Sequence, residues 1–130
     1  MDLITVTREE GLRFSIRIRN HVMTADMSVK DGGQDGGPAP VEIMGASMGA
    51  CLATLVQAYC NTRGYNDGDV AVSLTIEMVE SPNRIGGFVA DVELPKDVPE
   101  GEKEKLKKMC LRLPIPASLR AEPRVDIEMF

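Results

Sequence analysis

PVEIMGASMGACLATLVQAYCNTRG, residues 40–64, is the only long segment that combines helical periodicity, many small residues and a central cysteine, Cys51. Pro40 suits the first turn of a helix because its φ is already helical. Gly64 supplies the left-handed residue with which helices commonly end. The sequence therefore predicts a helix here, and its apolar residues recur at three- and four-residue spacings: Ile43, Met44, Met48, Leu52, Leu55, Val56 and Tyr59.

We expect this helix to be buried. No charged residue stands between Glu42 and Arg63, and a helix that is apolar nearly all round belongs in a core. A membrane span needs about 20 apolar residues, whereas this run is short and rich in small residues, so we expect no membrane. Its small-residue rows allow another backbone to approach closely. That backbone belongs either to a sheet or to the same helix of a second subunit.

The composition predicts one domain, residues 1–130, of modest size. The 20 acidic and 15 basic residues, a net charge of -5 and 4% aromatic residues disfavour nucleic acid as a partner. The acidic start does not resemble a signal sequence, so we expect a cytoplasmic protein. Three irregularly spaced cysteines indicate free or redox-active thiols. With a single histidine, His21, and no Cys/His ligand spacing, we expect neither a metal nor a cofactor.

The rest of the chain reads as strands and one surface helix. Strands are predicted at residues 3–7, 12–19 and 22–29 as a three-stranded meander, because residues 12–19 alternate strictly between apolar and polar. An antiparallel pair follows at residues 70–80 and 85–94, in which Gly86-Gly87 marks a bulge or a close approach. A helix starting at residue 99, ended by Pro114 and Pro116, and a strand at residues 125–129 complete the chain.

Residues 31–40, DGGQDGGPAP, form a loop by composition. A glycine-rich loop before a helix can hold phosphate on its N–H groups. This one lacks the Lys-Ser/Thr pair of such loops, and its two aspartates repel an anion. We therefore interpret it as a connecting or substrate-gating loop.

The element order is thus β-β-β-α-β-β-α-β, an α+β fold with antiparallel sheets around a long buried helix. One subunit alone supplies too little cover for that helix. We therefore expect a homodimer in which two such helices pack together beneath sheets from both chains.

The run from His21 to Cys51 resembles the OsmC/Ohr family of thiol-dependent hydroperoxide reductases. It contains H-x-x-x-x-D, then GGxxGGPxP, then Glu42 and a small-residue helix that reaches Gly-Ala-Cys, and the element order matches over the whole chain. The resemblance implies an OsmC-like fold, an intertwined homodimer with active sites at the subunit interface, and Cys51 as the peroxidatic residue. Its thiolate would attack a peroxide, and a second thiol would condense with the resulting sulfenic acid.

The sequence departs from the family pattern at the second cysteine. That cysteine stands in a Cys-Pro pair, and the matching pair here is Leu113-Pro114. Leucine cannot form the disulfide. Cys110 lies three residues earlier and would share a face with Leu113 if the helix continued that far, which makes it a possible resolving residue.

The activating charges also differ. The organic-hydroperoxide branch has glutamate directly after the proline, where this chain has Val41 and places Glu42 next. The arginine that activates the cysteine in that branch has no clear match in this chain. The candidates are Arg13 and Arg17, on the polar face of the second strand.

Each of these residues also has a structural interpretation. A free cysteine in a buried helix is commonly a small hydrophobe, and Cys60, about 180° around the helix from Cys51, is interpreted as structural. The favourable interaction of a carboxylate with the N-terminus of a helix is by itself enough to explain Glu42 at this position.

Two functions follow. One is a thiol peroxidase that reduces organic hydroperoxides through Cys51, with Cys110 or an external thiol as reductant. The other is a non-catalytic OsmC-like dimer that binds a small apolar ligand.

Overall fold

The computed structural model describes all 130 residues. They form two compact units, Met1–Gly45 and Ala46–Phe130, which are described separately. The boundary lies inside helix α1, Pro40–Arg63. The expectation of a single domain over residues 1–130 stays a prediction.

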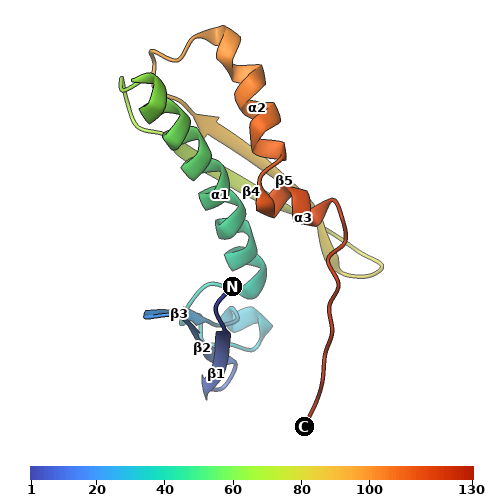
Figure 1. The fold of residues 1–130 in the computed structure, drawn as a ribbon. Coiled ribbons are helices and arrows are strands. Elements are labelled where there is room, and N and C mark those ends of the chain that lie inside the picture. The colour runs from blue at the N-terminus through green and yellow to red at the C-terminus, as the bar shows by residue number, and fades with distance from the viewer. The chain divides into compact units, whose positions relative to one another are not determined.

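The first unit contains a three-stranded antiparallel sheet in the order β1-β2-β3 (Figure 1). The strands are β1 (Ile4–Glu10), β2 (Arg13–Ile18) and β3 (His21–Ala25). The alternating sequence of β2 places it in the centre, and Gly11 turns the chain from β1 to β2 with a φ of 53°. The predicted meander is confirmed, although β1 runs three residues further than expected and β3 ends at Ala25, four residues earlier than expected.

Asp26, directly after β3, anchors the glycine-rich loop that contains η1 (Val29–Asp31). Its side chain accepts N–H groups from Met27 at 2.7 Å, Gln34 at 3.3 Å and Gly36 at 3.0 Å, and the residue is only 2% exposed. The Gly36 N–H contributes most to lowering the pKa of Asp26. A Cβ at Gly37 would lie 2.5 Å from a β3 carbonyl oxygen. The glycines therefore let the loop pack directly on β3.

Helix α1 has the predicted ends. It begins at Pro40, and it is followed by Gly64 with a φ of 75°. The Gly64 N–H donates to the Asn61 carbonyl at 3.3 Å, and the Tyr65 N–H donates to the Cys60 carbonyl at 2.9 Å. These two bonds form a Schellman motif, which satisfies carbonyls that the helix end leaves without partners.

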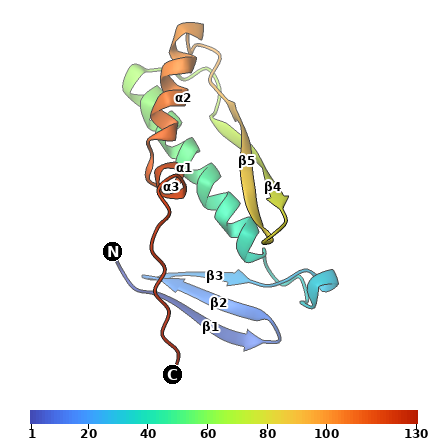
Figure 2. The ribbon, with the colours of Figure 1, turned by 90° about the vertical axis from the view of Figure 1, so that its right-hand side faces the viewer.

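In the second unit, helix α2 (Lys103–Leu111) and the α1 residues of that unit lie beside the hairpin of β4 (Ala71–Val79) and β5 (Arg84–Glu93), as Figure 2 shows. A short helix, η2 (Glu100–Glu102), leads into α2. The sequence predicted both strands and the helix, with small differences at their ends.

Gly86 forms the bulge that its sequence context predicts. The β4–β5 register shifts between Glu77 and Met78, so that Gly86 has no partner opposite it. A Cβ at Gly86 would lie 2.6 Å from a side-chain carbon of Val79. Both predicted reasons for glycine, a bulge and a close approach, are confirmed.

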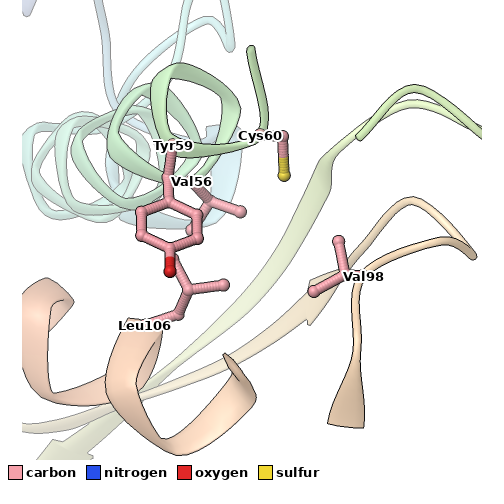
Figure 3. Packing of buried hydrophobic residues seen from close by; sticks show 5 residues of the cluster. All are labelled: Val56, Tyr59, Cys60, Val98 and Leu106. Carbon is pink, nitrogen blue, oxygen red and sulfur yellow. The ribbon is translucent and has the colours of Figure 1, made fainter. Parts of the chain in front are cut away.

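The core of the second unit joins α1, α2 and the segment after β5. Tyr59 and Val56 of α1 point toward Leu106 of α2, and Cys60 and Val98 complete the cluster (Figure 3). The Tyr59 hydroxyl also donates to Glu102 at the start of α2. These contacts fix α2 against the C-terminal half of α1.

Within one chain, α1 buries a single stripe rather than its whole surface. Its apolar residues below 10% exposure are Met48, Leu52, Val56, Tyr59 and Cys60. The hairpin and α2 pack on that stripe, and no element of the second unit covers the opposite side, where Ala50 and Ala58 are exposed. By length and composition α1 could also cross a membrane. Core helices of soluble proteins pass the same test, so the expectation of no membrane stays a prediction.

The prediction of a C-terminal strand at residues 125–129 is wrong. This segment has no regular structure because no strand of the chain pairs with it, and Val125, Ile127 and Met129 are exposed. A helix, α3 (Pro114–Leu119), precedes it where the sequence predicted no helix. Pro114 ends one helix and occupies the first turn of the next, a position that proline favours.

Candidate functional site

Cys51 and Cys60 have different environments on α1. Cys51 is half-buried, whereas Cys60 is 0% exposed within the core of the second unit. Burial, followed by the nearby Asp97 carboxylate, raises the pKa of the Cys60 thiol. A thiol that is fully buried cannot be reached by a peroxide. Of the two α1 cysteines, only Cys51 is accessible for chemistry.

Cys110 on α2 lies within electrostatic range of Cys51. Burial raises the pKa of the Cys110 thiol, and the negative charge of the Cys51 thiolate adds to this effect. The two predicted cysteines thus lie in one compact unit, within range of each other's charge. They do so because α2 packs along α1 through Leu106 and Tyr59.

The sequence argument that linked Cys110 to Leu113 is wrong in its geometry. Helix α2 ends at Leu111, and Leu113 has an extended backbone, with a ψ of 157°, as the N-cap of α3. Cys110 and Leu113 therefore do not share a helix face. Cys110 is brought near Cys51 by its own position on α2.

A cavity of about 790 Å³ opens beside this pair, and Cys110 is part of its wall. Its volume lies within the range of small-molecule sites, roughly 300–1,000 Å³. The wall comes from α1, β5, α2, α3 and the segment after β5, with mostly apolar side chains: Met48, Leu52, Val56, Phe88, Ala90, Val92, Leu94, Pro95, Lys96, Val98, Lys103, Leu106, Lys107, Cys110, Leu111, Pro116, Leu119 and Arg120.

Glu42 caps its own helix. Its carboxylate accepts the Ala39 N–H at 2.8 Å, which is the backward half of a capping box. It lies in the first compact unit, nine residues before Cys51. This geometry matches the structural interpretation of Glu42 at the helix N-terminus.

Arg13 and Arg17 also lie in the first unit. Arg13 bonds to Glu9 at 3.1 Å and to Glu10 at 3.4 Å, and its charge helps to lower the pKa of Asp26. Arg17 is exposed and has no ion pair. Of the two candidates, only Arg17 lacks a carboxylate partner.

Sequence reasoning missed the part of the cavity wall that α2 contributes. Lys103, Leu106, Lys107 and Cys110 follow the i, i+3, i+4, i+7 spacing of a single helix face. That spacing was present in the sequence and could have placed Cys110 with the apolar face. The wall residues of α3 carried no such signal, because the helix itself was not predicted.

No three His, Cys, Asp or Glu side chains come together as a metal site. The expectations of no metal and no cofactor stay predictions.

The family model described as OsmC-like protein matches residues 32–128. This chain belongs to the OsmC-like family. The match includes the glycine-rich loop, all of α1 and both cysteines of the pair, so the resemblance inferred from the sequence motifs is confirmed.

Solved structures share the fold of this OsmC-like chain. An osmotic stress induced and detoxification response protein from Psychrobacter arcticus 273-4 has a TM-score of 0.82 at 18% identity, covering 91% of this chain and 88% of that one. An OsmC like protein from Mycoplasma pneumoniae has a TM-score of 0.77 at 14% identity, covering 92% and 86%.

The organic hydroperoxide resistance protein OhrB of Bacillus subtilis has a TM-score of 0.55 at 18% identity, covering 93% of both chains. These likenesses confirm the α+β fold with antiparallel sheets. No curated protein sequence matches this OsmC-like chain.

Proposed function

We propose that this OsmC-like protein reduces organic hydroperoxides through Cys51. The observation that carries the proposal is that a half-buried Cys51 and Cys110 lie in one unit within range of each other's charge, with Cys110 in the wall of an apolar cavity. An apolar cavity suits the organic group of such a substrate. Family membership and fold neighbours named organic hydroperoxide resistance proteins support the same chemistry.

In the first step, the Cys51 thiolate attacks one peroxide oxygen. A sulfur–oxygen bond forms while the O–O bond breaks, and the departing alkoxide takes up a proton to become an alcohol. The sulfur is oxidised by two electrons to sulfenic acid, and the hydroperoxide is reduced by two.

In the second step, the Cys110 thiolate attacks the sulfenic sulfur of Cys51. The disulfide forms as the S–O bond breaks, and hydroxide leaves as water after protonation. An external dithiol then supplies two electrons and restores both thiols. In this scheme Cys110 takes the resolving role that Leu113 cannot perform.

Arg13 and Arg17 both stay candidates for thiolate activation, because they lie in the first unit and Cys51 lies in the second. Arg13 is already bound to two carboxylates, and Glu42 already caps α1, whereas Arg17 is exposed without an ion pair. A free guanidinium can stabilise a thiolate by charge.

Replacing Cys51 tests the proposal. With cumene hydroperoxide and dithiothreitol, we expect Cys51→Ser to lower peroxide consumption at least roughly 100-fold, because removal of a covalent nucleophile has very large effects. The matched control is Cys60→Ala, which changes a cysteine of the same helix and should retain activity. Equal rates for wild type and Cys51→Ser would rule out the peroxidase.

Ligand binding without catalysis is the second candidate. The specific observation in its favour is that Cys51 is not among the residues of the cavity wall, so the cavity is complete without it. The two candidates separate in the same assay, because a pure binding protein consumes no peroxide beyond the rate of dithiothreitol alone.

A further inference from the structure

A polar cluster joins the C-terminal half of α1 to the start of α2. The Tyr59 hydroxyl donates to the carboxylate of Glu102, the N-cap residue of α2. The Arg63 guanidinium lies 4.5 Å from the centre of the Tyr59 ring, and one of its nitrogens lies 3.9 Å from a Glu102 carboxylate oxygen. Tyr59 is only 9% exposed, and hydrogen bonds to an ionised carboxylate are stronger than neutral ones. The cluster therefore ties one residue of α1 to one residue of α2.

The two cysteines lie at equal distances from this hydrogen bond along their helices. Cys51 stands eight residues before Tyr59 on α1, and Cys110 stands eight residues after Glu102, whose backbone is already helical. The two helices run alongside each other in opposite directions (Figure 2). Eight residues correspond to about 12 Å of helix. The hydrogen bond and the cysteine pair are thus two matched levels of one antiparallel helix pair.

Apolar packing alone does not distinguish one register of these helices from the next. Leu106 packs with Val56 and Tyr59 between the two levels, and such contacts are not directional. A shift of α2 by one turn would move it about 5.4 Å along α1, whereas a disulfide needs Cα atoms about 4.4–6.8 Å apart. A hydrogen bond needs its donor and acceptor at the same level, so the Tyr59–Glu102 bond marks a single register.

We propose that the Tyr59–Glu102 hydrogen bond sets the register of α2 on α1 and so places Cys110 level with Cys51. Tyr59 and Glu102 are positioning residues, because neither belongs to the cavity wall and both act through the helices that carry the thiols. The inference rests on the proposed pairing of these cysteines, and it names the residues that determine how readily they pair.

The equilibrium of the cysteine pair with glutathione measures this positioning without any peroxide. In a Cys60→Ala background, each Cys51–Cys110 disulfide that forms gives two electrons to one oxidised glutathione, which is released as two thiols. Alkylation and mass spectrometry then yield the effective concentration of one thiol at the other. We expect Tyr59→Phe, which removes only the hydroxyl, to lower this concentration about tenfold, as the loss of one hydrogen bond to a charged group can do.

Rescue by a conservative variant separates positioning from general packing. Glu102→Gln keeps an acceptor oxygen and should retain the wild-type effective concentration, whereas Glu102→Ala should match Tyr59→Phe. Tyr65→Phe is the matched control, because Tyr65 packs against the same core cluster and takes no part in the bond. An effective concentration that Tyr59→Phe leaves unchanged, or that Tyr65→Phe lowers equally, would overturn the proposal.

The two steps of the peroxide reaction give a second readout. Tyr59→Phe should consume the first equivalent of cumene hydroperoxide at the wild-type rate, while dimedone traps more sulfenic acid on Cys51 because pairing is slower. Equal slowing of both steps would contradict a positioning role.

Failure of this proposal differs from failure of the peroxidase. If the wild-type pair forms its disulfide with glutathione and Tyr59→Phe weakens it, but no peroxide is consumed, the peroxidase fails and the register proposal stands. If peroxide oxidises Cys51 but no Cys51–Cys110 disulfide forms with glutathione, the register proposal fails and an external thiol completes the peroxidase.

Discussion

At the scale of the residue, the two cysteines of the proposed pair differ in how directly the sequence predicted them. The sequence placed Cys110 three residues before Leu113-Pro114 and linked it to that pair by an assumed helix. The helix ends at Leu111, so the link fails, and the resolving role of Cys110 stays a prediction. Cys51 needed no such step, because it lies within a long helix whose ends the sequence marks. Proximity of two cysteines from different helices depends on packing, which no local pattern contains.

The pH dependence of disulfide formation should identify Cys110 as the attacking thiol. Burial raises its pKa, so less thiolate is present near neutral pH than for an ordinary thiol. The rate should therefore keep rising with pH beyond about 8.5, the usual thiol value. Rapid quenching after one equivalent of cumene hydroperoxide, followed by mass spectrometry, measures this rate. A plateau below that pH would contradict the assignment.

At the scale of the element, local signals decided what the sequence could predict. Helix α1 was predicted at both ends because Pro40 and Gly64 act through their own backbone preferences. The bulge at Gly86 was predicted for the same reason.

Elements that depend on distant partners were not predicted correctly. Residues 125–129 alternate like a strand, yet no strand of the chain pairs with them. Helix α3 was missed because two prolines appeared to exclude a helix, although Pro114 begins one. In the sequence, Asp26 is recognisable only as the last residue of the H-x-x-x-x-D motif. Its role as the anchor of the glycine-rich loop depends on hydrogen bonds to residues up to ten positions away.

At the scale of the whole molecule, the chain exposes many apolar side chains. In the first unit several of them lie on β1 and β3, and in the second unit several lie along the C-terminal segment. They include Ile4, Val6, Val22, Met23, Val125, Ile127 and Phe130. Exposed apolar surface of this extent is typical of an interaction site.

We propose that a second copy of the chain covers this surface. Sedimentation equilibrium at micromolar concentration should then give twice the chain mass of 14.2 kDa. Homodimers bury apolar interfaces and are the commonest oligomers. A mass of 14.2 kDa across the concentration range would contradict the proposal.

The most direct test of the account is the location of the disulfide after one equivalent of cumene hydroperoxide. Peptide mass spectrometry of wild type should find Cys51 joined to Cys110, with Cys60 reduced, and Cys110→Ser should instead retain sulfenic acid on Cys51 that dimedone traps. Wild-type protein in which Cys51 stays a thiol, or in which Cys51 is oxidised while Cys110 stays free, would contradict the account.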